Sequence, residues 1–340
     1  MYYKKSIFTT ILFISVAIVS FSCGGDDGEI NESQNTIVQN QATEPKPSTW
    51  GKIISDQPQV FATSDIDQSL IDLNNKWYNI AVNTWGNYGP VELYIIGTNE
   101  QAAKTLEDDF CDRHKKLDSR WRVEWDCAND RYKIFTNYVE EGGAAVSVYR
   151  RDYIDYHFMT LIMSSKYPFP DEEDYKKTVL HEYFHVYQHA HIEDIEIEND
   201  RSVRGAKQGG ERKPWFAEGT AEYMAQLLYL RQPNVNPNYV KDSMRRNYYS
   251  INEYLSSGKN LKELSYSDQI SAADVGTWFI AYLVNQFGEE TVRVDFYQDL
   301  NSLGFEGSFE KHFIQSSDDL IDEFDIFIAG GLEKALEIIP

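Results

Sequence analysis

The 340-residue sequence is short of cysteine, of basic residues and of long apolar runs. Its three cysteines are too few for a small scaffold held together by several disulfides. The 32 Lys and Arg residues face 54 Asp and Glu, and the formal net charge of -22 would repel a polyanion such as DNA. Mean hydropathy is -0.51, and only the N-terminus is apolar enough to consider for a membrane. We therefore expect an acidic protein that does not bind nucleic acid.

The sequence does contain enough apolar material for a packed core, because 42% of its residues are hydrophobic and 14% are aromatic. This composition excludes a mostly disordered chain. At roughly 150 residues per domain, the length indicates about two domains or lobes.

The N-terminus has the pattern of an export signal. Lys4 and Lys5 precede the apolar segment 11–19, which is too short to cross a bilayer, and the small residue Ser22 stands before Cys23. Residues 1–22 resemble a bacterial lipoprotein signal peptide, which implies that Cys23 becomes the lipidated first residue of the mature chain. The alternative is ordinary signal cleavage that leaves Cys23 unmodified.

The segment after Cys23 is acidic and polar, and residues 23–50 have few apolar side chains. Such a segment cannot offset its ordering entropy by burial, so we expect a flexible tether. It also resembles the export tethers of surface lipoproteins in Bacteroidetes-type bacteria. That resemblance implies a lipid-anchored protein of the bacterial outer membrane or cell surface; the alternative is a periplasmic or secreted protein.

The two remaining cysteines are Cys111 and Cys127. If Cys23 carries lipid, they form the only possible pair in an oxidising compartment, and we expect a disulfide. A bridge that closes so short a loop would stabilise the fold by roughly 3 kcal/mol. The alternative is two buried free thiols, and a cysteine nucleophile is the least favoured interpretation because neither residue has a catalytic context.

The pattern of residues 51–165 indicates a strand-rich N-terminal lobe. One helix is expected near Glu100–Lys116, after a turn-prone segment. The expected strands are rich in Val, Ile, Tyr and Trp. They are Trp77–Trp85, Val91–Thr98, Arg120–Trp125, Arg131–Val139, Ala144–Arg150 and Tyr156–Met163.

Residues 166–340 have a helical pattern. A helix is expected to begin near Asp171, a second to cover Trp215–Leu230, and a third to cover Ala272–Phe287 and end at Gly288. Between the first two lies a loop, Arg201–Lys213, that carries five Lys or Arg residues. The two parts together predict an α+β fold, with a strand-rich N-terminal lobe followed by a mainly helical lobe.

The sharpest motif is His181-Glu182-Tyr183-Phe184-His185 on the first of these helices. The i, i+4 spacing places both imidazoles on one face, where a single Zn²⁺ can bind them. Glu182 lies near the same face, within reach of a water at the metal.

The second helix supplies the missing part of a catalytic zinc site, which needs three protein ligands and an open position. Glu218 lies in its first turn and is the candidate third ligand. Glu222 follows one turn later, where it could accept the second N–H of a ligating histidine. The alternative for Glu222 is a surface carboxylate.

These segments resemble the gluzincin metallopeptidases, in particular the peptidase MA-like and bacterial collagenase-like branches. Those families have His-Glu-Tyr-x-His followed by Trp-x-x-Glu-Gly-x-Ala-Glu-Tyr, which residues 215–223 match. The resemblance covers roughly residues 174–300. It implies that His181, His185 and Glu218 bind Zn²⁺, that Glu182 is the general base, and that Glu222 orients a histidine ligand.

A peptidase of this kind needs a further donor for the oxyanion, commonly a Tyr or His. Tyr266 is our candidate, and Tyr249 is the second. His189 and His191 are interpreted as packing or surface histidines because the ligand set is already complete. The basic loop could attract acidic substrates, although a solvated loop is the favoured interpretation.

The leading hypothesis is a monomeric zinc metalloendopeptidase that hydrolyses protein or peptide substrates through a zinc-activated water. The alternative from another class is a catalytically inactive surface binding lipoprotein on a peptidase scaffold. Glu182 argues against that alternative, because binding alone needs no general base. A third possibility is a zinc hydrolase that acts on non-peptide amides.

Overall fold

The computed structural model describes residues 49–129, 132–197 and 200–340. The expected signal peptide, Cys23 and nearly all of the expected tether lie outside these residues. The described residues belong to one compact unit, Pro47–Pro340. Its strand-containing first part and mainly helical second part confirm the α+β class. Within the described ranges, no helix is both long and apolar enough to span a membrane.

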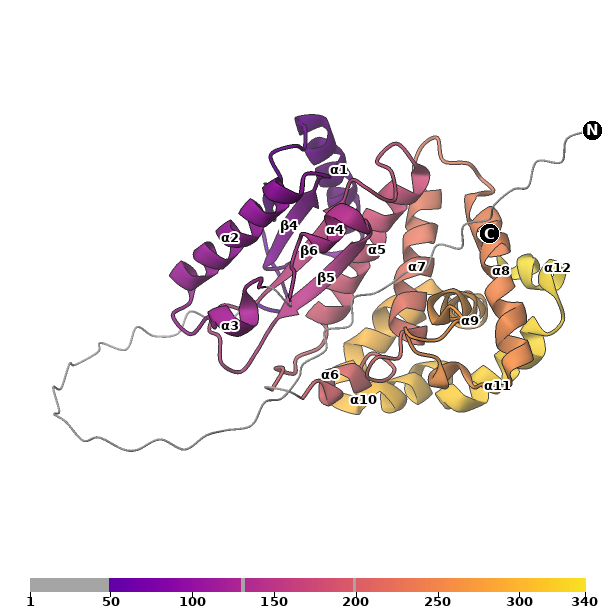
Figure 1. Ribbon diagram of the computed structural model, residues 1–340. Coiled ribbons are helices and arrows are strands. Elements are labelled where there is room, and N and C mark those ends of the chain that lie inside the picture. The colour runs from indigo at the N-terminus through magenta and orange to yellow at the C-terminus, as the bar shows by residue number, and fades with distance from the viewer. Residues whose placement is uncertain (1–48, 130–131, 198–199) are drawn as a thin grey trace, which may run out of the picture. The chain divides into compact units, whose positions relative to one another are not determined.

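A mixed four-stranded sheet forms the centre of the first part (Figure 1). Its order is β2 (Gln59–Ala62), β4 (Val91–Ile96), β6 (Phe158–Ser164) and β5 (Ala144–Tyr149). The first three strands run parallel, and β5 pairs antiparallel with β6. A separate antiparallel pair is formed by β1 (Lys52–Ile53), which precedes β2 in the sequence, and β3 (Tyr88–Gly89), which precedes β4.

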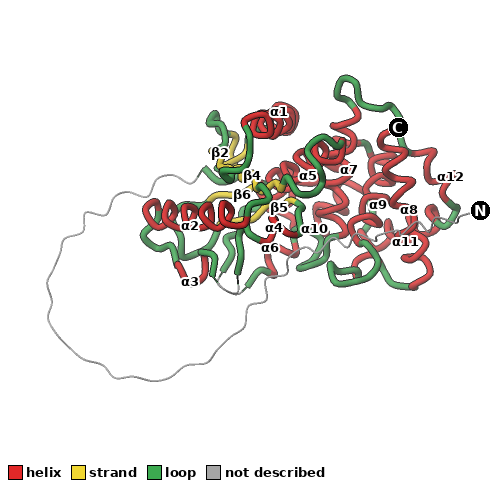
Figure 2. Tube along the Cα trace, turned by 45° about the horizontal axis from the view of Figure 1, so that its top comes forward, coloured by secondary structure: helices red, strands yellow, loops and turns green. Residues whose placement is uncertain are grey.

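Helices cover both faces of this sheet (Figure 2). Alternate side chains of the central strands enter two separate cores, as a strand period of two requires. Leu93 and Leu161 belong to the larger core with α1 (Gln68–Trp85) and α5 (Glu173–Ala190). Tyr94 and Phe158 belong to the smaller core with α2 (Glu100–Leu117). Every residue of β4 and β6 is buried, and apolar side chains predominate in both strands, as expected of strands covered on both faces. The charged exception is Glu92 of β4, which pairs with Arg113 at 3.1 Å.

The second part is a stack of helices that begins with α5 and continues away from the sheet (Figure 1). Helix α5 contacts α7 (Trp215–Leu230), which packs on α9 (Ala272–Phe287), and α9 contacts α8 (Tyr239–Ser257). The remaining elements are α6 (Ser202–Ala206), η1 (Leu261–Glu263), η2 (Thr291–Asp295), α10 (Phe296–Phe313), α11 (Ser317–Ile328), α12 (Leu332–Ala335) and η3 (Leu336–Ile338).

Three of the six expected strands are wrong. The first, Trp77–Trp85, is the second half of α1. Aromatic and β-branched residues favour a strand, but the buried side chains of this segment recur every three or four residues, and Asp67 caps the helix by accepting from the backbone N–H of Leu70. Helical spacing therefore outweighs strand-like composition here.

The second wrong strand, Arg120–Trp125, overlaps the short helix α3 (Val123–Asp126). A strand would place Trp121 and Trp125 on one face, whereas Trp121 is 7% exposed and Trp125 is 50% exposed. The carboxylate of Asp126 accepts from the backbone N–H of Arg122 at 3.0 Å, and this contact closes the turn.

The third wrong strand, Arg131–Val139, is a loop that leads into α4 (Asn137–Glu140), and its residue 131 is outside the described ranges. The backbone N–H groups of Ile134, Phe135 and Thr136 donate to one carboxylate oxygen of Glu107 at 2.7–2.9 Å. A buried side chain of α2 therefore takes the donors that a neighbouring strand would have bound.

The other expected elements are confirmed with small shifts at their ends. The strands near 91, 144 and 156 are β4, β5 and β6, and the helices near 100, 171, 215 and 272 are α2, α5, α7 and α9. Gly288 follows α9 with φ of 89°, as a helix-ending glycine does. Cys111 and Cys127 form the expected disulfide.

Candidate metal centre

Burial of one face of helix α5 fixes the direction in which the two histidines of the motif point. Glu173 and Asp174 lie in the first turn, where negative charge complements the helix dipole. Val179, Leu180 and Tyr183 are fully buried, which sets the rotation of the helix about its axis. His181 and His185 project from a neighbouring face, one turn apart, toward α7.

Helix α7 brings Glu218 to this face from its first turn. The indole N–H of Trp215 donates to the carbonyl of Gly209 at 2.9 Å and anchors the start of the helix. Gly219 crosses Gly276 of α9 so closely that a Cβ at Gly219 would come within 2.4 Å of the Gly276 backbone. Two glycines therefore set the distance between α7 and α9, and with it the position of Glu218.

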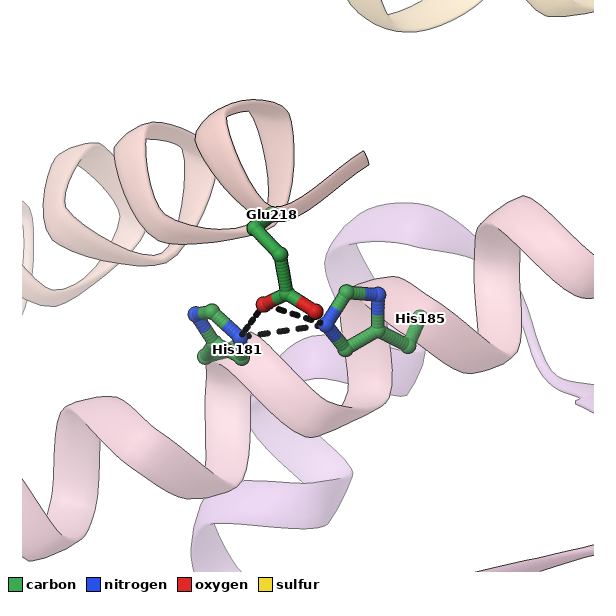
Figure 3. Close-up of side chains that lie close together, drawn as sticks. All are labelled: His181, His185 and Glu218. Carbon is green, nitrogen blue, oxygen red and sulfur yellow. Dashed lines mark hydrogen bonds and ion pairs between the residues drawn. The ribbon is translucent and has the colours of Figure 1, made fainter. Parts of the chain in front are cut away.

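The three candidate ligand atoms converge on one point (Figure 3). Nε2 of His181 and Nε2 of His185 are 3.1 Å apart, and Oε2 of Glu218 is 3.3 Å from each. Bonds of about 2.0–2.1 Å to a tetrahedral Zn²⁺ would separate two ligand atoms by about 3.3 Å. The spacing of the donors therefore fits zinc, and the three side chains retain 12–21% exposure, which leaves access for a fourth ligand.

The other ring nitrogen of each histidine faces an acceptor. Nδ1 of His181 is 2.9 Å from Oε2 of Glu222, and Nδ1 of His185 is 2.7 Å from Oε1 of Gln188. An acceptor at Nδ1 holds the proton there and leaves the Nε2 lone pair free for a metal. The structure thus places Glu222 where the sequence suggested, and it adds Gln188, which sequence reasoning missed although it lies one helical turn after His185.

The electrostatics of the cluster favour a cation. Burial lowers the pKa of His181, but hydrogen bonds to Glu218 and Glu222 outweigh it and raise this pKa to about 10. Burial likewise opposes the charged form of His185, yet the carboxylate of Glu218 raises its pKa. Despite its own burial, Glu218 has a pKa well below its usual value because of His185 and His181. The same attraction is available to Zn²⁺.

Glu182 is buried beside the cluster and differs from the other two carboxylates. It is 5% exposed, and within the described chain its carboxylate has no hydrogen-bond partner. Burial raises its pKa, although the nearby histidines and Lys177 oppose this effect. A carboxylate with a raised pKa and no fixed partner is suited to accept and return a proton.

Tyr266 lies at the edge of the cluster, in the segment between η1 and α9. Its phenol donates to Oε1 of Glu218 at 2.7 Å, and 45% of the residue is exposed. Burial of its hydroxyl and the charge of Glu218 raise the pKa of Tyr266, so the phenol stays a donor at neutral pH. Tyr249, the second candidate, lies in α8 with 55% exposure, and within the described chain it makes no hydrogen bond to the cluster.

The two later histidines of α5 have other surroundings. Nδ1 of His191 faces the carbonyl of Tyr187 at 2.8 Å, and its ring packs against that of Tyr187. Nδ1 of His189 is 3.4 Å from the side-chain nitrogen of Gln208. Burial, followed by the charge of Arg204, holds the pKa of His189 well below its usual range. Neither histidine belongs to the converging ligand set.

The basic loop is more ordered than the favoured interpretation, a solvated loop, suggested. It contains α6, and Arg201 pairs with Glu196 at 2.8 Å. Lys207 pairs with Asp194 at 2.5 Å, and Lys213 donates to a backbone carbonyl at 2.6 Å. Two of the five cations of this loop, Arg201 and Lys207, therefore form ion pairs within the protein, which weakens the idea that the loop attracts acidic substrates.

Residues 174–299 match the model of the M61 glycyl aminopeptidase family, a family of zinc metallopeptidases. The match covers less than half of the chain, but it contains both histidines, Glu182, Glu218, Glu222 and Tyr266. No curated protein and no solved structure matches the chain. The match therefore supports a metallopeptidase in the helical part, and the strand-containing part has no counterpart in it.

Proposed function

We propose that this protein is a zinc-dependent metallopeptidase that hydrolyses peptide bonds at the His181, His185 and Glu218 centre. The single observation that carries the proposal is the convergence of three donors at tetrahedral zinc spacing, each histidine having an acceptor at Nδ1. The match to the M61 family supports the same class of reaction.

Zinc at this centre would supply Lewis acidity toward the scissile carbonyl and toward a bound water. The residues of the chain would do the rest. Glu182 takes a proton from the attacking water and returns it to the leaving amine. Tyr266 donates a hydrogen bond to the oxyanion, because its phenol already lies beside a ligand oxygen. Glu222 keeps the ring of His181 in position.

The sheet beside the centre supports a peptide as the substrate. Strand β5 is the last strand of the described sheet, so its outer edge carries backbone groups without a neighbouring strand. This strand packs against α5, the helix that carries both histidines. An extended peptide could add to that edge by backbone hydrogen bonds and pass over the centre.

Two modes of cleavage are to be distinguished. The sequence suggests internal cleavage, whereas the name of the matched family points to removal of an N-terminal residue, with glycine preferred. Pairs of peptides that differ only in N-terminal acetylation separate the modes. An endopeptidase cleaves both members of a pair, and an aminopeptidase cleaves only the free one.

The test of the proposed reaction is hydrolysis of a peptide library by the purified protein, measured together with zinc per chain. We expect about one zinc per chain, loss of hydrolysis on chelation, and loss of hydrolysis in Glu182→Gln with zinc retained. Glu253→Gln, an exposed carboxylate of α8, is the matched control. Zinc binding without any hydrolysis would favour the inactive binding lipoprotein instead, and full activity in Glu182→Gln would refute the role of Glu182.

We further propose that the protein is lipid-anchored at the bacterial cell surface, on the strength of the lipoprotein-like N-terminus alone. Cys23 is outside the described residues. Metabolic labelling with a fatty-acid analogue tests this proposal, because Cys23→Ser should abolish labelling and release the protein from membranes. Labelling that persists in Cys23→Ser would refute lipidation at this residue.

A further inference from the structure

A largely buried lysine lies beside the candidate metal centre. Lys177 lies on α5 one turn before His181, and its ammonium group is 2.7 Å from Oε2 of Glu222. The two side chains are only 14% and 16% exposed. Burial disfavours the charge of Lys177, but Glu222 raises its pKa, so the pair is ionised. The sequence pattern did not single out this residue.

Glu222 is held by three donors. Lys177 and His181 share Oε2, at 2.7 Å and 2.9 Å, and the amide of Gln226 donates to Oε1 at 2.8 Å. Gln226 is fully buried and its amide also lies 3.3 Å from the hydroxyl of Ser243. The carboxylate therefore has little freedom to turn away from His181 while these partners are present.

Among the three donors to Glu222, we expect Lys177 to matter most for the position of this carboxylate, because of its charge. The centre gathers three carboxylates, those of Glu182, Glu218 and Glu222, in a poorly solvated region. Lys177 contacts Glu222 directly and also acts on Glu182 through space. Removing one partner of a buried ion pair leaves the other charge uncompensated. Without Lys177, Glu222 would be expected to turn toward water or another donor.

We propose that Lys177 is a positioning residue for the metal centre: its ammonium group holds Glu222 against Nδ1 of His181 and so keeps Nε2 of His181 aimed at the metal. The inference rests on the proposed zinc centre and deepens it. The side chains between α5 and α7 thus form two layers: the ligands lie in one layer, and the Lys177–Glu222 pair lies in the next.

A double-mutant cycle tests this role in the full-length protein, with Zn²⁺ affinity of the folded protein measured by chelator competition. Lys177→Met and Glu222→Gln are the single variants, and the third variant combines them. Lys176→Met is the matched control, because Lys176 lies on another face of α5. The unfolding midpoint of each metal-free variant is measured separately, and Lys177→Gln replaces Lys177→Met if that variant does not fold.

We expect Glu222→Gln and Lys177→Met each to weaken zinc binding about 10-fold or more, which is the usual effect of losing an outer-shell partner. The double variant should be no weaker than Glu222→Gln, because Lys177 acts through Glu222. Excess zinc should restore the peptidase activity of Lys177→Met, whereas a purely structural lysine would lower the unfolding midpoint and leave zinc affinity unchanged.

The inference is overturned if Lys177→Met binds zinc as tightly as the unchanged protein, or if the two effects multiply fully in the double variant. These results differ from failure of the proposed function. If the unchanged protein bound no zinc, the centre itself would be wrong. If it bound zinc and only the effect of Lys177 were missing, the centre would stand and the role of Lys177 would fall.

Discussion

Nδ1 of His185 lies 2.7 Å from Oε1 of Gln188, a side chain that is only 2% exposed. The amide nitrogen of Gln188 donates to the carbonyl of Ala217 at 2.9 Å and to the hydroxyl of Tyr297 at 3.1 Å. These donations leave Oε1 as the acceptor for the ring. The second histidine is thus oriented by α7 and α10 through a buried amide, and not by its own helix alone.

Replacing this amide should weaken the metal centre. In Gln188→Leu the ring of His185 loses its acceptor, and we expect zinc affinity to fall about 10-fold. Chelator competition measures the change, and Gln101→Leu on the exposed side of α2 is the control. Unchanged affinity in Gln188→Leu would mean that the helix backbone alone fixes the ring.

Removing the hydroxyl of Tyr266 should affect turnover more than binding. If the phenol donates to the oxyanion, Tyr266→Phe should lower kcat by about 10²–10³-fold and change KM much less. Tyr249→Phe should have no such effect, because Tyr249 makes no hydrogen bond to the cluster in the described chain. If Tyr266→Phe had a normal kcat and Tyr249→Phe a reduced one, Tyr249 and not Tyr266 would be the donor to the oxyanion.

Asp274 gives a prediction about pH and stability. It lies in the first turn of α9, where burial raises its pKa from 3.8 to about 6 despite hydrogen bonds from Ser250 and Ser271. The folded state therefore holds this proton more tightly than the unfolded state does. Its contribution to the free energy of unfolding is largest at low pH and decreases as the pH rises from about 4 to about 6.

Asp274→Asn should remove this dependence, because the amide resembles the protonated acid. The free energy of unfolding of the variant, minus that of the unchanged protein, should therefore rise by up to about 3 kcal/mol as the pH increases from acid to neutral. Urea titrations at several pH values measure the difference between the two proteins. A difference that is constant with pH would show that Asp274 ionises as readily in the folded state as in the unfolded one.

The disulfide should contribute to stability without contributing to the metal centre. It joins α2 to the segment after α3 across 16 residues, in the smaller core on the far face of the sheet from α5. Cys111→Ala/Cys127→Ala should lower the free energy of unfolding by about 3 kcal/mol. Zinc affinity of the folded variant should be unchanged, and a parallel loss of zinc would reveal coupling across the sheet.

The sequence was most informative where chemistry and helical period coincide. The spacing of His181 and His185 and the position of Glu218 predicted a cluster that the folded chain does bring together. Glu222 was predicted beside a histidine ligand and lies there. Gln188 and Lys177 occupy positions one helical turn from the two histidines, but a lone Gln or Lys on a helix carries no chemical signal until its partners are known.

The strand-containing part was less predictable because its local pattern conflicts with its tertiary contacts. Trp77 and Trp85 belong to a residue class that favours strands, yet they face the core from a helix. The segment around Phe135 has strand-like composition, and only the buried carboxylate of Glu107 explains why its backbone is not paired in the sheet. Such long-range polar contacts cannot be read from one stretch of sequence.

The contact between α7 and α9 gives a last prediction about the metal centre. A Cβ at Gly276 would come within 1.9 Å of the carbonyl oxygen of Trp215, one turn before Glu218. Gly276→Ala must therefore move α7, at a cost of about 1–3 kcal/mol for overpacking. We expect weaker zinc binding in the folded variant, because the shift displaces one ligand relative to the two on α5. Gly307→Ala, whose added methyl would meet only a side-chain atom of Leu303 at 3.1 Å, should bind zinc normally. Normal zinc affinity in Gly276→Ala would mean that Glu218 can follow the movement of its helix.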